Sequence, residues 1–158
     1  MARVVSRRGW LHHVEVWRDD ATAVEGPWPW LLQQLGYVRT DTWATGCSWS
    51  PSEPEGGSSG GSDGGWGAGA YVVLESGADH VRGRSQRLRS GVNHLAFWAG
   101  TRAEVDALVA QAPGHGWRLL FAERHPHAGG PGHYAAYLED EAGFEVELVA
   151  EQPPPTPR

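Results

Sequence analysis

The feature that most constrains the fold of this chain is a short pattern that occurs twice. Residues 13–17 read HVEVW and residues 94–98 read HLAFW, so the second copy begins 81 residues after the first. Apolar residues two apart in each copy are typical of a half-buried strand. A pattern that returns over this distance in a chain of 158 residues indicates two copies of one structural module.

The segments that follow the first copy indicate one helix and three strands. Pro27 and Pro29 favour the start of a helix, and Gly36 favours its end. Strands are expected near 37–43, 46–50 and 70–76.

The segments that follow the second copy repeat this order. A helix is predicted over 101–112, with a capping box formed by Thr101 and Glu104. Strands are expected at 118–123, 133–139 and 144–150. The sequence therefore predicts an α+β fold of two βαβββ modules in tandem.

Composition places the module boundaries. The first module is predicted at 10–76 and contains a glycine-rich insert, GGSSGGSDGGWGAG, at 56–69. Residues 77–91 are interpreted as a linker that carries four arginines, 92–150 as the second module and 151–158 as a tail.

Charge and composition exclude several classes of protein. A formal net charge of −6 argues against nucleic-acid binding, which needs a basic face. No apolar run reaches the ~18 residues of a membrane span, and no signal peptide is recognised. With the single Cys47, which cannot form an internal disulfide, this predicts a cytoplasmic protein. The chain has no lysine, so Schiff-base chemistry on a lysine side chain is excluded.

Strand alternation assigns the two faces of each predicted sheet. The apolar residues of the repeated strands point towards the helices. The opposite face carries four side chains at matching places in the repeat: His13, Glu75, His94 and Glu147. Two imidazoles and two carboxylates suit one divalent ion such as Zn, Ni, Co, Fe or Mn. A single histidine on such a strand more often has a structural role, and it is the repetition that favours a metal site.

The repeat resembles the vicinal oxygen chelate superfamily, the fold of glyoxalase I, methylmalonyl-CoA epimerase, extradiol dioxygenases, fosfomycin-resistance enzymes and bleomycin-binding proteins. The resemblance is carried by HHVEVW at 12–17, NHLAFW at 93–98 and YLEDEAGFEVELV at 137–149. The last segment is similar to the family's D-P-D-G-x-x-x-E-L ending, with Glu141 and Ala142 in place of the usual Pro-Asp. The resemblance implies mixed sheets that curve round a central cleft, helices outside, and a homodimer.

The same resemblance implies site residues and a chemistry. His13 and His94 fall at the first-strand ligand position, and Glu75 and Glu147 at the last-strand position. Four protein ligands are typical of glyoxalase-type isomerases and lyases. The implied enzyme binds one divalent ion and acts on a small substrate with vicinal oxygens through a stabilised enolate. Either Glu147 or Glu75 is the candidate base.

Further residues on the cleft face or in a loop are candidates for substrate binding: Glu15, Trp17, Tyr71, Trp98, His127 and His133. For the tryptophans plain packing is an equal alternative, and for the loop histidines solvent exposure is the commoner one. Glu15 and Glu145 are interpreted either as supports of the ligands or as rim charges. The linker arginines fit an anionic substrate tail, although a solvated linker is the commoner reading.

Two other functions stay open at this point. A bleomycin-resistance-like protein would sequester an aromatic natural product, and nine tryptophans favour this alternative. An extradiol-type dioxygenase would use iron and two histidines with one carboxylate, and would not need Glu75.

Overall fold

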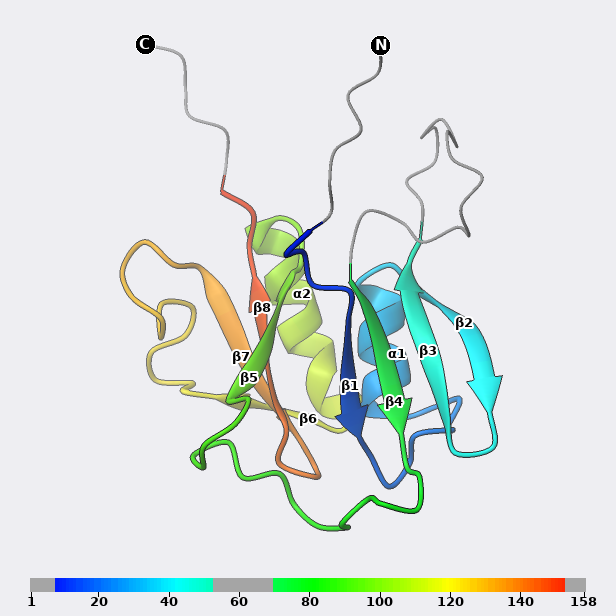
Figure 1. Ribbon diagram of the computed structural model, residues 1–158. Coiled ribbons are helices and arrows are strands. Elements are labelled where there is room, and N and C mark those ends of the chain that lie inside the picture. Colours follow the sequence, from blue (N-terminus) through cyan, green and yellow to red (C-terminus); the bar gives the residue numbers. More distant parts are fainter. Residues whose placement is uncertain (1–7, 53–69, 153–158) are drawn as a thin grey trace, which may run out of the picture. The chain divides into compact units, whose positions relative to one another are not determined.

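The computed structural model describes residues 8–52 and 70–152. The glycine-rich insert predicted at 56–69 and most of the predicted tail lie outside these residues. The elements are β1 (His13–Trp17), α1 (Pro27–Gln34), β2 (Tyr37–Trp43), β3 (Gly46–Pro51), β4 (Tyr71–Glu75), β5 (His94–Trp98), α2 (Arg102–Gln111), a 3-10 turn η1 (Ala112–His115), β6 (Trp117–Leu120), β7 (Ala135–Asp140) and β8 (Glu145–Val149) (Figure 1). The predicted α+β fold of two βαβββ modules is confirmed.

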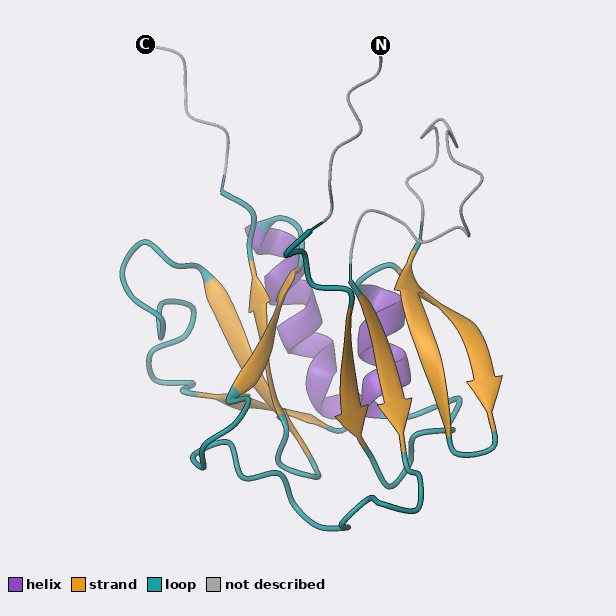
Figure 2. Cartoon of the chain, viewed as in Figure 1, coloured by secondary structure: helices purple, strands orange, loops and turns teal. Residues whose placement is uncertain are grey.

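Each module forms a mixed four-stranded sheet (Figure 2). The strand orders are β1-β4-β3-β2 and β5-β8-β7-β6, so the two sheets have the same topology. In both sheets the first and last strands of the module pair in parallel, and the other neighbours pair antiparallel. The parallel pair is what brings the two predicted ligand strands of a module side by side.

Contacts divide the chain into two compact units, which are described separately below. Unit 1 comprises Met1–Ala23 and Gly36–Arg82, and unit 2 comprises Val24–Leu35 and Gly83–Arg158. Helix α1 thus belongs to unit 2, although its sequence lies inside the predicted first module.

The indole groups explain why α1 joins unit 2. Trp28 Nε1 donates to Asp140 Oδ2 at 3.0 Å, and Trp117 Nε1 donates to the Pro27 carbonyl at 2.9 Å. The Trp28 ring also packs edge-on against Phe144, with centroids 5.4 Å apart. A buried indole needs both apolar contact and a partner for its N–H, and the second sheet supplies both.

Helix α2 forms as its sequence predicts. The Thr101 hydroxyl accepts from the Glu104 backbone N–H at 3.3 Å, and the Glu104 carboxylate accepts from the Thr101 N–H at 2.7 Å. This reciprocal cap satisfies donors that would otherwise lack partners in the first turn. Val105 and Leu108 are buried and fix the helix to unit 2.

Two predicted strands are shorter than expected. β6 ends at Leu120, because Phe121 adopts a left-handed backbone conformation with φ of 53°. β7 begins only at Ala135, which leaves His133 in the preceding loop. None of the helices formed by the described residues has both the length and the apolar character that a membrane crossing requires.

Candidate active site

Unit 2 gathers polar side chains around one buried carboxylate. Glu147 on β8 is 6% exposed. Its Oε2 lies 3.1 Å from His94 Nε2, and its Oε1 lies 2.5 Å from His133 Nε2. A carboxylate can only accept, so both imidazoles donate to it. Tyr137 also hydrogen-bonds to Glu147. We call these four residues the Glu147 cluster.

Strand register explains how the Glu147 cluster forms. In the parallel pair, Glu147 lies opposite Ala96, and His94 lies two residues earlier on the same face. On the other side Tyr137 of β7 lies directly opposite Glu147.

The loop before β7 delivers His133. A Cβ at Gly129 would lie 2.6 Å from the His133 ring and 2.7 Å from the Tyr137 hydroxyl, so only glycine allows the loop to approach this closely. His127, predicted with His133 to bind substrate, lies behind it, with Nδ1 3.3 Å from the His133 carbonyl oxygen. The structure therefore brings His133 to Glu147, while His127 contacts the loop backbone.

Hydrogen bonding sets the charge of the Glu147 cluster. Burial alone raises the pKa of Glu147, but the hydrogen bonds from His133 and Tyr137 and the nearby imidazoles outweigh it, so this pKa lies below its ordinary value. Burial, together with the hydrogen bond and charge of Glu147, raises the pKa of Tyr137 to about 12. At neutral pH the carboxylate is ionised and the phenol keeps its proton.

Glu145 is the second buried carboxylate of β8. Its burial raises its pKa, against the opposing charges of Arg87 and His94. Arg87 Nε lies 3.0 Å from Glu145 Oε2. One of the four arginines of the predicted linker thus supports the strand that carries the site.

Phe121 adds a strained residue beside the cluster. Its φ of 53° is rare for a bulky side chain. The ring packs edge-on against Tyr137 at 5.6 Å, and Tyr137 packs edge-on against His94 at 5.8 Å. Backbone strain of this kind gathers at functional sites, because the surrounding structure must hold it in place.

In unit 1 the predicted ligands His13 and Glu75 lie at opposite ends of the paired strands. His13 lies opposite Tyr71 and stacks on its ring, with centroids 4.8 Å apart. His13 Nδ1 is also 2.9 Å from His12 Nδ1. Glu75 lies at the other end of β4, opposite Trp17. Unit 1 therefore does not bring these two ligands together as unit 2 brings His94 and Glu147.

Four donors surround the Glu75 carboxylate. Trp43 Nε1 donates to its Oε2 at 2.6 Å, and the Ser76 N–H donates to its Oε1 at 2.9 Å. Hydrogen bonds from Thr45, Trp43, Ser76 and Gly77 together lower the pKa of Glu75, against the opposing effect of burial. These hydrogen bonds favour the ionised carboxylate and hold it in place at the end of β4.

The register of the parallel strand pairs corrects one inference that was drawn from the sequence repeat. Glu147 lies opposite Ala96, whereas the equivalent residue of unit 1, opposite Glu15, is Val73. Glu75 shares the predicted face but lies two residues further along the strand. The assumption that Glu75 and Glu147 are equivalent was wrong, because spacing in the sequence cannot fix pairing across the connection between β3 and β4.

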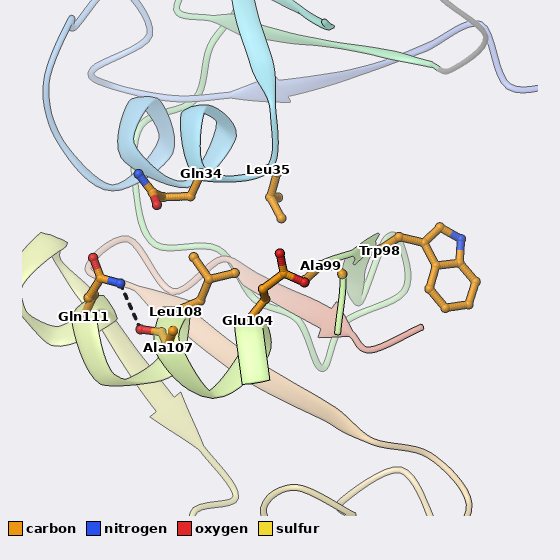
Figure 3. A pocket seen from close by; sticks show the side chains of 9 residues that line it. Gln34, Leu35, Trp98, Ala99, Glu104, Ala107, Leu108 and Gln111 are labelled. Atoms are coloured by element: carbon orange, nitrogen blue, oxygen red, sulfur yellow. Dashed lines mark hydrogen bonds between the residues drawn. The ribbon is translucent and has the colours of Figure 1, made fainter. Parts of the chain in front are cut away.

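The remaining predicted residues are exposed or line other surfaces. Glu15 and Trp17 are exposed, and the Trp17 ring packs against His80 with centroids 5.5 Å apart. Trp98 is 68% exposed and lies at the edge of a hollow of about 320 Å³ between α1 and α2 (Figure 3). Glu104 and Leu108 line the same hollow, to which no member of the Glu147 cluster contributes.

His94 and Glu147 fit two positions of a metal site. Their nitrogen and oxygen lie 3.1 Å apart, which suits two ligands that each lie ~2.0–2.2 Å from one ion. Among residues 8–52 and 70–152 no group of three or more His, Cys, Asp or Glu side chains is arranged to hold a metal ion. The predicted set of four ligands draws on both units and stays a prediction.

Comparison with known proteins identifies the family. No protein-family profile matches the chain. It is 34% identical over 140 residues to the uncharacterized protein YqjT of Bacillus subtilis, covering 89% of this chain and 98% of YqjT. It is also 34% identical to a candidate glyoxalase of known structure from Bacillus halodurans, with a TM-score of 0.73, covering 92% of this chain and 98% of that one.

More distant structures share the fold alone. The fosfomycin resistance protein FosX of Listeria monocytogenes is 17% identical with a TM-score of 0.57, covering 91% of this chain and 92% of that one. The chain belongs to the glyoxalase/bleomycin resistance/dioxygenase family, within the vicinal oxygen chelate superfamily.

Proposed function

We propose that this protein is a glyoxalase-like enzyme in which Glu147 removes a proton from carbon beside a carbonyl group of a small substrate with vicinal oxygens. The observation that supports this most is an ionised carboxylate in a buried position, held by two imidazoles and a phenol. The three donors keep this carboxylate ionised and fix its direction, so it is ready to accept a proton from a correctly placed C–H group.

The chemical step needs only groups of this chain and the substrate. The C–H proton passes to Glu147, and the electron pair of that bond forms an enolate whose negative charge lies on the former carbonyl oxygen. Protonated Glu147 then gives the proton to the former carbonyl carbon while the hydroxyl proton of the substrate passes to the enolate oxygen, which completes an isomerisation. An epimerisation instead returns a proton to the original carbon on its opposite face. Tyr137 keeps its proton near neutral pH and is a hydrogen-bond donor throughout.

A divalent metal ion is the second component of the proposal. His94 and Glu147 would hold it, with His13 as the predicted ligand from unit 1. When bound, such an ion polarises a carbonyl oxygen and stabilises the negative charge that develops there. Glu75 lies two residues beyond the position equivalent to Glu147, and this register does not favour it as a ligand or as the base.

Exchange of substrate hydrogen with solvent tests the proposed base without knowledge of the product. A panel of 2-hydroxy and 2-oxo carbonyl compounds is incubated with the protein in D2O, and loss of the C–H signal is followed by NMR. We expect exchange with the wild type and a loss of at least about a hundredfold in Glu147→Gln. Glu139→Gln is the matched control on the neighbouring strand. Equal exchange in Glu147→Gln and wild type would contradict the proposal.

Metal content tests the second component separately. We expect about one transition metal per site in untagged wild-type protein by elemental analysis, and its loss in His94→Ala. Absence of metal, with no thermal shift on addition of Ni, Co, Zn, Mn or Fe, would remove the ion from the proposal.

A second candidate function is supported by the register of β4. Val73 stands where a fourth ligand would be symmetric with Glu147. The remaining His13, His94 and Glu147 resemble the two-histidine, one-carboxylate set of extradiol dioxygenases. Oxygen uptake with a panel of catechols, in protein loaded with Fe(II), distinguishes this function from proton abstraction.

A further inference from the structure

A row of four residues crosses the sheet of unit 1 at one end. Trp43 of β2 pairs with Gly46 of β3, Gly46 pairs with Glu75 of β4, and Glu75 pairs with Trp17 of β1. Residues that pair directly point to the same face of a sheet. The row therefore places a carboxylate between two indoles.

Glycine at position 46 shapes this row. A Cβ there would lie 2.8 Å from two carbons of the Trp43 ring, so this ring lies over Gly46. From that position its Nε1 reaches Glu75 at 2.6 Å. Gly77 sits close on the other side, since a Cβ there would lie 3.3 Å from Glu75 Oε1 and 3.9 Å from the Trp17 ring.

Both indoles stay accessible to a ligand. Trp17 is 43% exposed and Trp43 is 38% exposed, although each is large and apolar. His80 packs against the Trp17 ring with centroids 5.5 Å apart and lies 3.5 Å from Asp19, and Arg82 lies 3.3 Å from the same Asp19 carboxylate. Among residues 8–52 and 70–152 no basic side chain forms an ion pair with Glu75.

We propose that Trp17, Glu75 and Trp43 bind the quaternary ammonium group of a small molecule. Indole faces attract a cation through their quadrupole, and a carboxylate between them adds a full negative charge. Trp43 and Ser76 already donate to the two Glu75 oxygens, so the site recognises charge and shape rather than N–H groups. A quaternary ammonium has no N–H group, so it needs no hydrogen-bond acceptor at this site. This inference does not depend on the function proposed for Glu147.

A matched pair of ligands tests the proposal. Choline and 3,3-dimethylbutan-1-ol have nearly the same shape, but only choline is charged. We expect choline to bind the wild-type protein at least about tenfold more tightly than the neutral alcohol, measured by calorimetry or ligand-observed NMR. Equal binding of the two compounds, or binding of neither, would overturn the proposal.

Variants locate the binding. Glu75→Gln keeps the shape of the side chain and should weaken choline about tenfold while leaving the neutral alcohol unchanged. Trp17→Leu, at an exposed position, should weaken choline by a similar factor. Asp41→Asn removes one negative charge from the same sheet outside the row and serves as control. If thermal unfolding shows the variants folded, and Glu75→Gln and Trp17→Leu bind choline as tightly as Asp41→Asn and the wild type do, the assignment is wrong.

Discussion

The parallel strand pairs of the two units share one pairing pattern but carry their carboxylates at different positions. In β5 and β8 the third row holds Glu147, buried opposite Ala96. In β1 and β4 the same row holds Val73, and the carboxylate appears two residues later as Glu75, between two tryptophans. The comparison teaches that a repeat can keep its backbone and core while its chemistry diverges, because function depends on individual side chains and not on the fold.

Matched core truncations test whether the two pairs are equivalent in packing. Leu74 of β4 and Leu148 of β8 occupy the same row and are both almost fully buried. We expect Leu74→Ala and Leu148→Ala each to lower the free energy of unfolding by about 2–5 kcal/mol in urea denaturation. A loss of less than about 1 kcal/mol for either variant would show that the two strand pairs are not equivalent in packing.

The two sheets also differ at one end, where unit 1 has Gly46. Its counterpart in unit 2 is Ala135, but in unit 1 a Cβ would lie 2.4 Å from the Leu74 carbonyl oxygen. We expect Gly46→Ala to cost about 1–3 kcal/mol in the same assay, because backbone or the Trp43 ring must move. Ala135→Gly is the control, with an expected cost of about 0.5–1 kcal/mol. Stabilisation by Gly46→Ala would contradict the description of the row.

The pH dependence of stability tests the environment of Glu147. Its pKa is lower in the folded protein than the ordinary value of a glutamate, so its contribution to stability is present above the unfolded pKa and is lost as pH falls through the folded pKa. In metal-free protein we expect the difference in free energy of unfolding between wild type and Glu147→Gln to shrink as the pH falls through the folded pKa of Glu147. Thermal unfolding across an acid series measures it, and a constant difference would argue against the hydrogen bonds to His94 and His133.

Glu145, two residues away, should show the opposite trend. Its pKa is raised in the folded protein, so the stability it contributes is present below its unfolded pKa and is lost as pH rises through the folded pKa. We expect the free energy of unfolding of Glu145→Gln to increase relative to that of the wild type as the pH rises from the unfolded to the folded pKa of Glu145. Glu145→Gln also removes the ion pair with Arg87, and this loss offsets part of the gain in stability. The variant Arg87→Gln alone measures the contribution of the ion pair.

Much of the fold follows from local sequence signals. Alternation in HVEVW and HLAFW identified equivalent strands and their faces, and Thr101 with Glu104 identified the start of α2. These signals are short-range, so one sequence suffices to show them. The assignment of α1 to unit 2 was not predictable, because it depends on which sheet offers the Trp28 indole an acceptor.

The candidate site was predictable only in part. His94 and Glu147 do meet in unit 2, and His133 joins them. Tyr137 was missed, although the short gap between the strands predicted at 133–139 and 144–150 could have placed it opposite Glu147. The position of Glu75 could not be found, because a long connection leaves the register of the following strand free.

The connections within the two sheets also have a consequence for the order of folding. β7 and β8 are joined by residues 141–144, whereas β3 and β4 are joined by residues 52–70. The conformational entropy lost on closing a loop grows with its length, and non-local strand pairing slows folding. The hairpin that carries Tyr137 and Glu147 can therefore form early, from local contacts. The sheet made from the first part of the chain is expected to assemble after the one made from the last part.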